Sequence, residues 1–189
     1  QDLIVSSPRN GNELRNLLYA ALEYKDGPFA IRYPKASSEE FDQNLQAELL
    51  PIGSWEVLQN GNDVAILAVG PLTYLALEAA EELKKLDISC EVVNCRFIKP
   101  MDENYLEFML EKFSSVLTIE EGVRSGGFGE GVLSWLLSNN YKGNSSIISL
   151  PDKFVEHGPR DLLLEKWGTN KEEIIKTVTS FKSSLKTEF

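Results

Sequence analysis

The sequence has few of the residue types that most often mark a functional site. Its 189 residues include two cysteines and one histidine, so we do not expect a metal site built from these side chains. The longest uninterrupted apolar run, from Val64 to Val69, is far below the roughly 18 residues of a membrane-spanning helix. No signal peptide is recognisable at its start. We therefore do not expect a membrane protein.

Positive charge is also scarce. Nineteen Lys and Arg against twenty-nine Asp and Glu leave a net charge of −10, and such a field repels nucleic-acid phosphates and anionic lipid. We expect neither nucleic acid nor a membrane surface as a partner. The 42% hydrophobic and 25% charged residues are ordinary for a globular protein. The length suits one domain, or one domain with a fragment of another.

The two cysteines, Cys90 and Cys95, lie in an apolar stretch, 89–98, whose pattern predicts one strand. Their odd spacing would direct the thiols to opposite faces, and five residues of strand span about 16 Å. A disulfide needs Cα atoms within about 7 Å. We therefore expect free thiols and a reducing, cytoplasmic location.

Residues 1–35 read as strand, helix and strand, with the strands at 3–7 and 29–33. The apolar residues of the predicted helix share one stripe: Leu14, Leu17, Leu18, Ala21 and Leu22. This unit is only about a quarter of a doubly wound α/β domain. We therefore expect the chain to be the end of something longer.

Residues 36–50 are polar and acidic, as in a linker, and strands alternate with helices over 51–189. The run 63–69 is typical of a strand covered on both faces. Asp102 and Asn170 are expected to cap helices. The alternation predicts a three-layer α/β fold with a mostly parallel sheet. Further strands are expected at 55–58 (an edge strand), 92–93, 115–119 and 147–150.

A glycine-rich segment, 122–131, follows the strand at 115–119, where open α/β sheets bind ligands. It matches neither a Walker motif nor a strict G-x-G-x-x-G, so a tight turn that brings helix and sheet together is the better interpretation. The adjacent Glu120 and Glu121 should face opposite ways and form a poor acid–base pair. We expect them to be solvated or interface carboxylates.

Two more side chains are candidates for function. His157, in a loop between a strand and a helix, is the only imidazole available to carry a proton near neutral pH. A lone histidine is more often a structural donor. Arg32 lies on an otherwise apolar strand and is either a fork for a phosphate or carboxylate, or half of a structural ion pair. The residues alone leave both possibilities open.

Five separated segments carry a resemblance to a known family, in its order and with its spacing. They are 26–35 (DGPFAIRYPK), 50–53 (LPIG), 96–102 (RFIKPMD), 118–122 (TIEEG) with 126–129 (GGFG), and 150–158 (LPDKFVEHG). Together they resemble, from about residue 3 to about residue 180, the C-terminal part of the 1-deoxy-D-xylulose-5-phosphate synthase family of transketolase-like thiamine-diphosphate enzymes. Transketolase and the β subunit of 2-oxoacid dehydrogenases share this fold and remain alternatives. The 150–158 segment favours the synthase.

The resemblance implies a transferase that condenses pyruvate with D-glyceraldehyde 3-phosphate, with loss of CO2, in isoprenoid, thiamine and pyridoxal synthesis. Thiamine diphosphate and Mg²⁺ would serve the full-length enzyme. The family's Gly-Asp-Gly and Asn-Asn motif is absent from this sequence, as is the glutamate that activates the aminopyrimidine. We therefore expect no catalytic, cofactor-binding or metal-binding residue in this chain, no cofactor bound to it alone, and no activity of its own.

By position, residues 1–35 resemble the end of the middle, pyrimidine-binding domain, and residues 51–189 the C-terminal domain. Arg32 matches the arginine that holds the aldehyde substrate's phosphate, Ala36 stands where the family usually has glycine, and His157 matches a position without an assigned role. Expected partners are the remaining N-terminal and middle domains, and a second subunit of a homodimer. The alternative is a non-catalytic interaction domain that acts through a partner interface alone.

Overall fold

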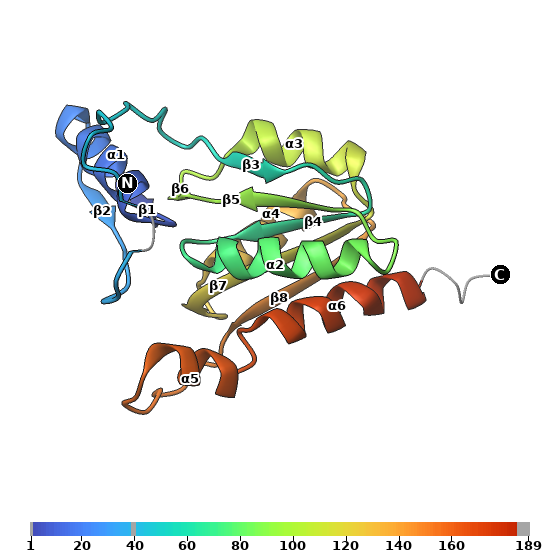
Figure 1. The fold of residues 1–189 in the computed structure, drawn as a ribbon. Coiled ribbons are helices and arrows are strands. Elements are labelled where there is room, and N and C mark those ends of the chain that lie inside the picture. The colour runs from blue at the N-terminus through green and yellow to red at the C-terminus, as the bar shows by residue number, and fades with distance from the viewer. Residues whose placement is uncertain (1, 39–40, 185–189) are drawn as a thin grey trace.

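The structure is a computed structural model that describes residues 2–38 and 41–184. Residues 39–40 of the predicted linker lie outside the described residues, as do residue 1 and the last five residues. The chain forms two sheets, and Figure 1 shows the smaller one beside one end of the larger. The described residues of 36–50 contain no helix or strand.

The larger sheet has five strands in the order β3-β5-β4-β7-β8. Strands β5, β4, β7 and β8 are parallel, and β3 pairs with β5 in the antiparallel sense at the edge. This confirms the predicted, mostly parallel sheet and its edge strand. The strands are β3 (Glu56–Gln59), β4 (Val64–Ala68), β5 (Cys90–Asn94), β7 (Ser115–Val123) and β8 (Asn144–Leu150).

Helices cover both faces of this sheet, so the predicted three layers are confirmed (Figure 1). One face carries α2 (Leu72–Lys84) and α6 (Lys171–Ser184), and the other carries α3 (Glu103–Lys112) and α4 (Phe128–Ser138). Strand β4 is buried throughout because its alternate side chains enter two separate apolar clusters. The short helix α5 (Arg160–Lys166) lies at one corner, outside these layers (Figure 1).

The smaller sheet has the order β2-β1-β6. Strands β1 (Ile4–Ser6) and β2 (Phe29–Ile31) are parallel and are joined through α1 (Gly11–Glu23). The predicted strand–helix–strand unit is therefore present. The third strand, β6 (Phe97–Lys99), pairs with β1 in the antiparallel sense. The smaller sheet thus takes strands from both sides of the predicted linker.

The prediction of one strand over residues 89–98 is wrong. The segment divides into β5 in the larger sheet and β6 in the smaller one. Between them, the Cys95 amide donates to the Ala68 carbonyl at 2.8 Å, and the Arg96 carbonyl accepts from the Ser7 amide at 2.9 Å. These two bonds join the segment to different sheets. The apolar pattern is continuous because β5 is buried throughout and β6 begins with the buried Phe97.

The predicted stripe on α1 is only partly buried. Leu17 is fully buried, together with Ala20, whereas Leu18 and Leu22 are 51% and 71% exposed. The helix lies against a sheet of only three strands, which covers one narrow side of it. The other half of the apolar stripe therefore faces away from the described chain.

Both predicted helix caps are present. One oxygen of Asp102 accepts from the Tyr105 amide at 3.0 Å, and its other oxygen accepts from the Trp55 amide at 2.8 Å. Asn170 accepts from the Glu173 amide at 2.9 Å. Asp102 therefore begins α3 and also holds the start of the edge strand.

The two cysteines are free and buried on opposite faces of the larger sheet, as predicted. Cys90 packs with residues of α2 and α6, and Cys95 packs with residues of α3 and α4. Among the described residues, no helix combines the length and the apolar character needed to span a bilayer.

We expect neither thiol of the folded chain to react with Ellman's reagent at pH 8. Burial, helped by the charge of Asp63, raises the pKa of the Cys90 thiol to about 12. Burial, helped by Asp102, also raises the pKa of the Cys95 thiol well above its usual range. Because the thiolate is the reactive form, the absorbance of the released chromophore should reach two equivalents only in denaturant. Rapid release of one equivalent of chromophore in buffer would show that one of the two thiols is accessible, which would contradict its burial in the structure.

Candidate functional site

A cavity of about 560 Å³ lies where the two sheets meet, at the carboxyl ends of their parallel strands. We call it the edge cavity. The segments after β1 and β2 line one side, and the first turns of α2 and α6 line the other, together with α5. Open α/β sheets bind ligands at this edge. Its lining includes Arg9, Tyr33, Tyr74, Arg160 and Lys171.

The glycine-rich segment at the same edge encloses the carboxylate of Glu120. This side chain is 2% exposed and accepts from the Phe128 amide at 3.0 Å and the Gly129 amide at 2.8 Å. A Cβ atom on Gly122 or Gly127 would lie 2.3 or 2.7 Å from a Glu120 oxygen. The glycines therefore make room for a carboxylate that occupies the N-terminus of α4. The predicted tight turn fits this arrangement better than a phosphate cradle.

The expectation of a solvated or interface carboxylate is therefore wrong for Glu120. Glu121 points the other way, as predicted, and pairs with the Arg160 guanidinium through both of its oxygens. One of these hydrogen bonds, to Arg160 Nε, is 3.1 Å long. Glu121 is partly exposed and joins the end of β7 to α5. The two adjacent carboxylates thus hold two different helices.

The structure brings Arg32 to this edge, beside Glu120. The Arg32 amide donates to the Ser6 carbonyl at 2.8 Å, and the residue is exposed. A Cβ atom on Gly122 would lie 3.5 Å from Arg32 Nη1, as well as 2.3 Å from Glu120. Arg32 thus has a carboxylate nearby and is also accessible to a ligand. The prediction that it binds phosphate stays a prediction.

His157 is exposed in the loop between β8 and α5. Within the described part of the chain, no hydrogen bond or ion pair fixes its side chain. The neighbouring Phe154 is also fully exposed. The structure therefore does not bring His157 into the constellation around Glu120.

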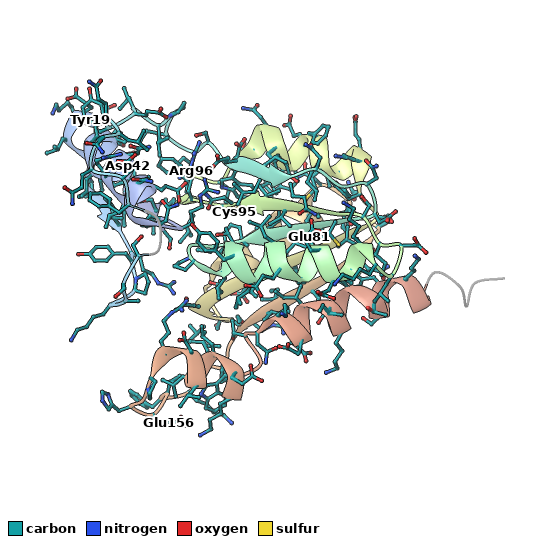
Figure 2. All side chains as sticks on the ribbon, viewed as in Figure 1. Tyr19, Asp42, Glu81, Cys95, Arg96 and Glu156 are labelled. Carbon is teal, nitrogen blue, oxygen red and sulfur yellow. The ribbon has the colours of Figure 1, made fainter. Side chains whose placement is uncertain are left out.

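A buried polar cluster between α1 and the larger sheet was missed by sequence analysis. Glu13, 6% exposed, accepts from the Asn94 side chain at 2.6 Å and from the Arg9 amide at 2.7 Å. The Arg96 guanidinium lies 3.8 Å from Glu13 and donates to the backbone and hydroxyl oxygens of Ser54. Figure 2 shows Arg96 between α1 and the strands of the larger sheet. Burial raises the pKa of Glu13, whereas Arg9, Arg96 and Asn94 oppose that shift.

The only sequence signal for this cluster was weak. Glu13 lies in the first turn of a predicted helix, where a carboxylate is favourable in any case, and Arg96 stands at the start of one family segment. Neither position shows that the two side chains meet. The cluster fixes the smaller sheet against the larger one.

Thiamine diphosphate with its metal needs free amides or cations for the diphosphate, and oxygen ligands for the metal. At the N-terminus of α4, the amides of Phe128 and Gly129 are already bonded to Glu120. No group of three or more His, Cys, Asp or Glu residues that could hold a metal occurs within 2–38 and 41–184. The N-terminus of α4 therefore does not fit the diphosphate of this cofactor.

The fold and its edge define a doubly wound, five-stranded α/β sheet joined to a smaller three-stranded sheet, with a cavity between them. The family model described as the transketolase C-terminal domain matches residues 53–174. The chain belongs to the transketolase C-terminal domain family.

Curated relatives carry the name of the synthase suggested by the motifs. A protein of Bacillus cereus (strain AH820) named 1-deoxy-D-xylulose-5-phosphate synthase is 41% identical over 177 residues, which cover 92% of this chain and 28% of that protein. A protein of the same name from Geobacillus sp. (strain WCH70) is 42% identical over 180 residues, 94% of this chain and 28% of that protein. The resemblance is confirmed, and the chain spans about 28% of the length of these relatives.

A similar solved structure is titled "Split gene transketolase, inactive beta4 tetramer". It has a TM-score of 0.83 and 30% sequence identity, and the match covers 95% of this chain and 57% of that chain. The match covers more of the chain than the residues of the family model do.

We expect Glu120→Ala to lower the free energy of unfolding by about 2–4 kcal/mol, because two buried amides lose a charged acceptor at a helix N-terminus. Urea unfolding followed by circular dichroism measures this. The matched control is Glu121→Ala, which removes a partly exposed ion pair and should cost about 1 kcal/mol or less. Equal losses in the two variants would contradict the role given to the buried carboxylate.

Proposed function

We propose that this chain is the C-terminal part of a 1-deoxy-D-xylulose-5-phosphate synthase, a transketolase-type transferase. The full-length enzyme condenses pyruvate with D-glyceraldehyde 3-phosphate and releases CO2, in isoprenoid, thiamine and pyridoxal synthesis. The observation that carries this proposal is the 41–42% identity to proteins of that name over more than nine-tenths of the chain. Thiamine diphosphate and Mg²⁺ act in the full-length enzyme, where the cofactor carries the carbon chemistry.

Within that enzyme, the chain serves assembly. Residues 1–35 are the end of the middle domain, 36–50 a linker and 51–189 the C-terminal domain. Two surfaces support the need for a partner. Among the described residues, β2 pairs with β1 alone and is an edge strand of the smaller sheet, and the apolar Leu18 and Leu22 are exposed on α1. The remaining part of the middle domain would cover both.

Two further properties belong to the same proposal. The enzyme is a homodimer, as proteins of this architecture commonly form symmetric oligomers. It works in the cytoplasm, where buried free thiols such as Cys90 and Cys95 stay reduced.

Arg32 contributes the substrate site of this chain. Its guanidinium is exposed at the carboxyl edge of the smaller sheet, where the phosphate of the aldehyde substrate can reach it. Glu120 lies nearby, but its carboxylate is held by two amides of α4, which leaves the guanidinium available to a ligand. A planar guanidinium suits bidentate binding of phosphate.

A second candidate function is that of a separately acting assembly subunit. The solved relative whose title describes a split-gene transketolase in an inactive β4 tetramer favours it. Such a chain would associate with itself or with a separate catalytic chain.

A chimera tests the main proposal. The corresponding C-terminal part of the Geobacillus sp. (strain WCH70) relative is replaced by this chain, and product formation from pyruvate and D-glyceraldehyde 3-phosphate is measured. We expect activity within about tenfold of the parent, because 42% identity over 180 residues preserves the fold and most contacts. The parent truncated before the replaced part, and this chain alone, should form no product. Calorimetry of this chain alone with thiamine diphosphate and Mg²⁺ should show no binding heat.

A chimera that elutes at the parent's size and binds thiamine diphosphate, but forms no product, would contradict the proposal. Self-association of this chain into a stable tetramer, together with such an inactive chimera, would favour the second candidate.

In the active chimera, Arg32→Met should raise the KM for D-glyceraldehyde 3-phosphate by roughly 5- to 150-fold, the effect of losing about 1–3 kcal/mol of charged hydrogen bonding. The KM for pyruvate should change little. The matched control is Lys35→Met, which removes an exposed cation three residues further along the chain. An unchanged KM in Arg32→Met would contradict the role of Arg32 in phosphate binding. An increase in KM only in Lys35→Met would indicate that Lys35 binds the phosphate instead.

A further inference from the structure

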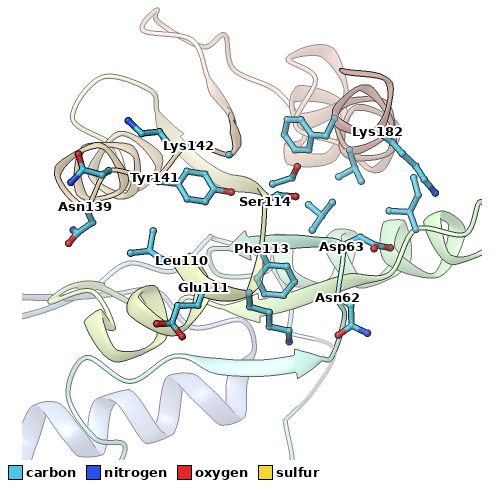
Figure 3. A pocket seen from close by; sticks show the side chains of 18 residues that line it. Asn62, Asp63, Leu110, Glu111, Phe113, Ser114, Asn139, Tyr141, Lys142 and Lys182 are labelled. Carbon is cyan, nitrogen blue, oxygen red and sulfur yellow. The ribbon is translucent and has the colours of Figure 1, made fainter. Parts of the chain in front are cut away.

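Cavities lie at both edges of the larger sheet, and they differ in which part of the chain forms their walls. One, of about 670 Å³, lies at the amino ends of the parallel strands (Figure 3). Its described lining residues belong to the larger sheet, its covering helices and their loops. The edge cavity instead takes one wall from residues 2–38, which contain β1, α1 and β2 and which we call the N-terminal unit. The shape of the edge cavity therefore depends on how this unit is held.

One peptide group of the N-terminal unit connects Arg32 with Arg96. The carbonyl of Ser6 accepts from the Arg32 amide at 2.8 Å, and the amide of Ser7 donates to the Arg96 carbonyl at 2.9 Å. These two atoms belong to the same peptide group, which is planar and rigid. The backbone of Arg32 is therefore two hydrogen bonds away from the backbone of Arg96, and a shift of one relative to the other must break or bend one of these bonds.

The Arg96 side chain contacts both parts of the molecule. Its Nε and Nη2 atoms donate to the backbone and hydroxyl oxygens of Ser54, both at 2.9 Å. Its Nη1 atom lies 3.8 Å from a carboxylate oxygen of Glu13, on α1. The guanidinium is largely buried between α1 and the larger sheet, where Figure 2 labels it. Arg96 therefore joins the start of the edge strand β3 to the N-terminal unit.

Glu13 makes the same connection from the other side. Its carboxylate accepts from the Asn94 side chain of β5 at 2.6 Å and from the Arg9 amide at 2.7 Å. Glu56 lies 3.7 Å from both Arg9 and Arg96, so two carboxylates and two guanidinium groups balance one another. Buried charges are stable only when they are paired. Removal of the charge of Glu13 or of Arg96 therefore leaves an unbalanced charge at this contact.

Apolar packing also holds the N-terminal unit, but it does so without fixing its orientation. Ile4 and Leu17 enter the apolar cluster that contains Trp55 and Phe97. This contribution is non-directional, whereas the hydrogen bonds of Glu13 and Arg96 require particular distances and angles. We therefore expect variants of the polar cluster to fold, with the N-terminal unit less precisely placed.

We propose that Glu13 and Arg96 are positioning residues for Arg32. They fix the N-terminal unit against the larger sheet, and the peptide group between Ser6 and Ser7 transmits this position to Arg32. The identity of the ligand of Arg32, the phosphate of the aldehyde substrate, rests on the proposed function. The connection from Glu13 and Arg96 to Arg32 does not, and it can be tested in this chain alone.

The first test is hydrogen exchange of the ¹⁵N-labelled chain, followed by NMR. Glu13→Gln keeps the size of the side chain and removes its charge. Exchange of the Ser7 and Arg32 amides should become faster by about tenfold or more, the effect of weakening a charged hydrogen bond on local opening. Exchange of the amides of β4 should change by less than about twofold, because these open only with the whole sheet. Arg96→Met should give the same pattern.

The matched control is Glu23→Gln, which removes an exposed carboxylate at the other end of α1. Its amides should exchange as in the parent. Unchanged exchange at Ser7 and Arg32 in Glu13→Gln would overturn the proposal. Equal acceleration at these amides and at β4 would also overturn it, because the cluster would then stabilise the whole fold and not the position of Arg32.

The second test uses the active chimera and two aldehydes. Glu13→Gln should raise the KM for D-glyceraldehyde 3-phosphate by about three- to tenfold and leave kcat within about twofold. The kcat/KM for D-glyceraldehyde, which lacks the phosphate, should be unchanged, because Arg32 has no phosphate to bind there. In the Arg32→Met background, Glu13→Gln should have no further effect on KM, since residues that act through one another are not additive.

Equal losses of kcat/KM with the two aldehydes would contradict a role through Arg32, as would additive effects of Glu13→Gln and Arg32→Met on KM. An inactive parent chimera would instead contradict the proposed function. The exchange rates of Ser7 and Arg32 would still decide whether Glu13 and Arg96 position Arg32, so the two failures are distinguishable.

Discussion

The segment from β5 to β6 is the constraint on which the rest of the structure depends, because one stretch of chain pairs with both sheets. Its Cys95 amide bonds to the larger sheet, and its Arg96 carbonyl bonds to the smaller one. The Arg96 side chain reinforces the connection through Ser54 and the buried carboxylate of Glu13. A buried charge of this kind is tolerated only where donors surround it. The edge cavity and the approach of Arg32 to Glu120 both follow from the fixed position of the smaller sheet.

At the carboxyl ends of the parallel strands, the N-terminus of α4 could bind an anion, and a side chain of the same protein, Glu120, occupies that position. The N-terminus of α4 carries unpaired amides and a partial positive charge, and Glu120 satisfies both from the neighbouring strand. The same carboxylate lies beside an arginine of the smaller sheet. The glycines around this carboxylate have little freedom to change, because a Cβ atom on Gly122 or Gly127 would lie 2.3 or 2.7 Å from one of its oxygens.

Local patterns predicted the features that depend on neighbouring residues. The apolar run of β4 and the caps at Asp102 and Asn170 are set by short-range chemistry, and all were found. What failed depended on contacts outside the strand pattern itself. Burial of Glu120 requires Gly122 and Gly127, where a Cβ atom would meet its carboxylate, and a helix that begins eight residues later. The division of residues 89–98 depends on pairing with β1, more than 90 residues earlier in the chain. No periodicity in one segment carries that information.

The position of α5 has a consequence for local stability. This helix is attached to the layers by Leu164, which enters the cluster under α2 and α6, and by the partly exposed pair of Glu121 and Arg160. Its Leu162 is 67% exposed, and the loop before it carries the fully exposed Phe154. Segments with so few buried contacts open at a lower free energy than the sheet. This corner of the molecule can therefore unfold as a separate unit, and salt would promote its opening by screening the ion pair.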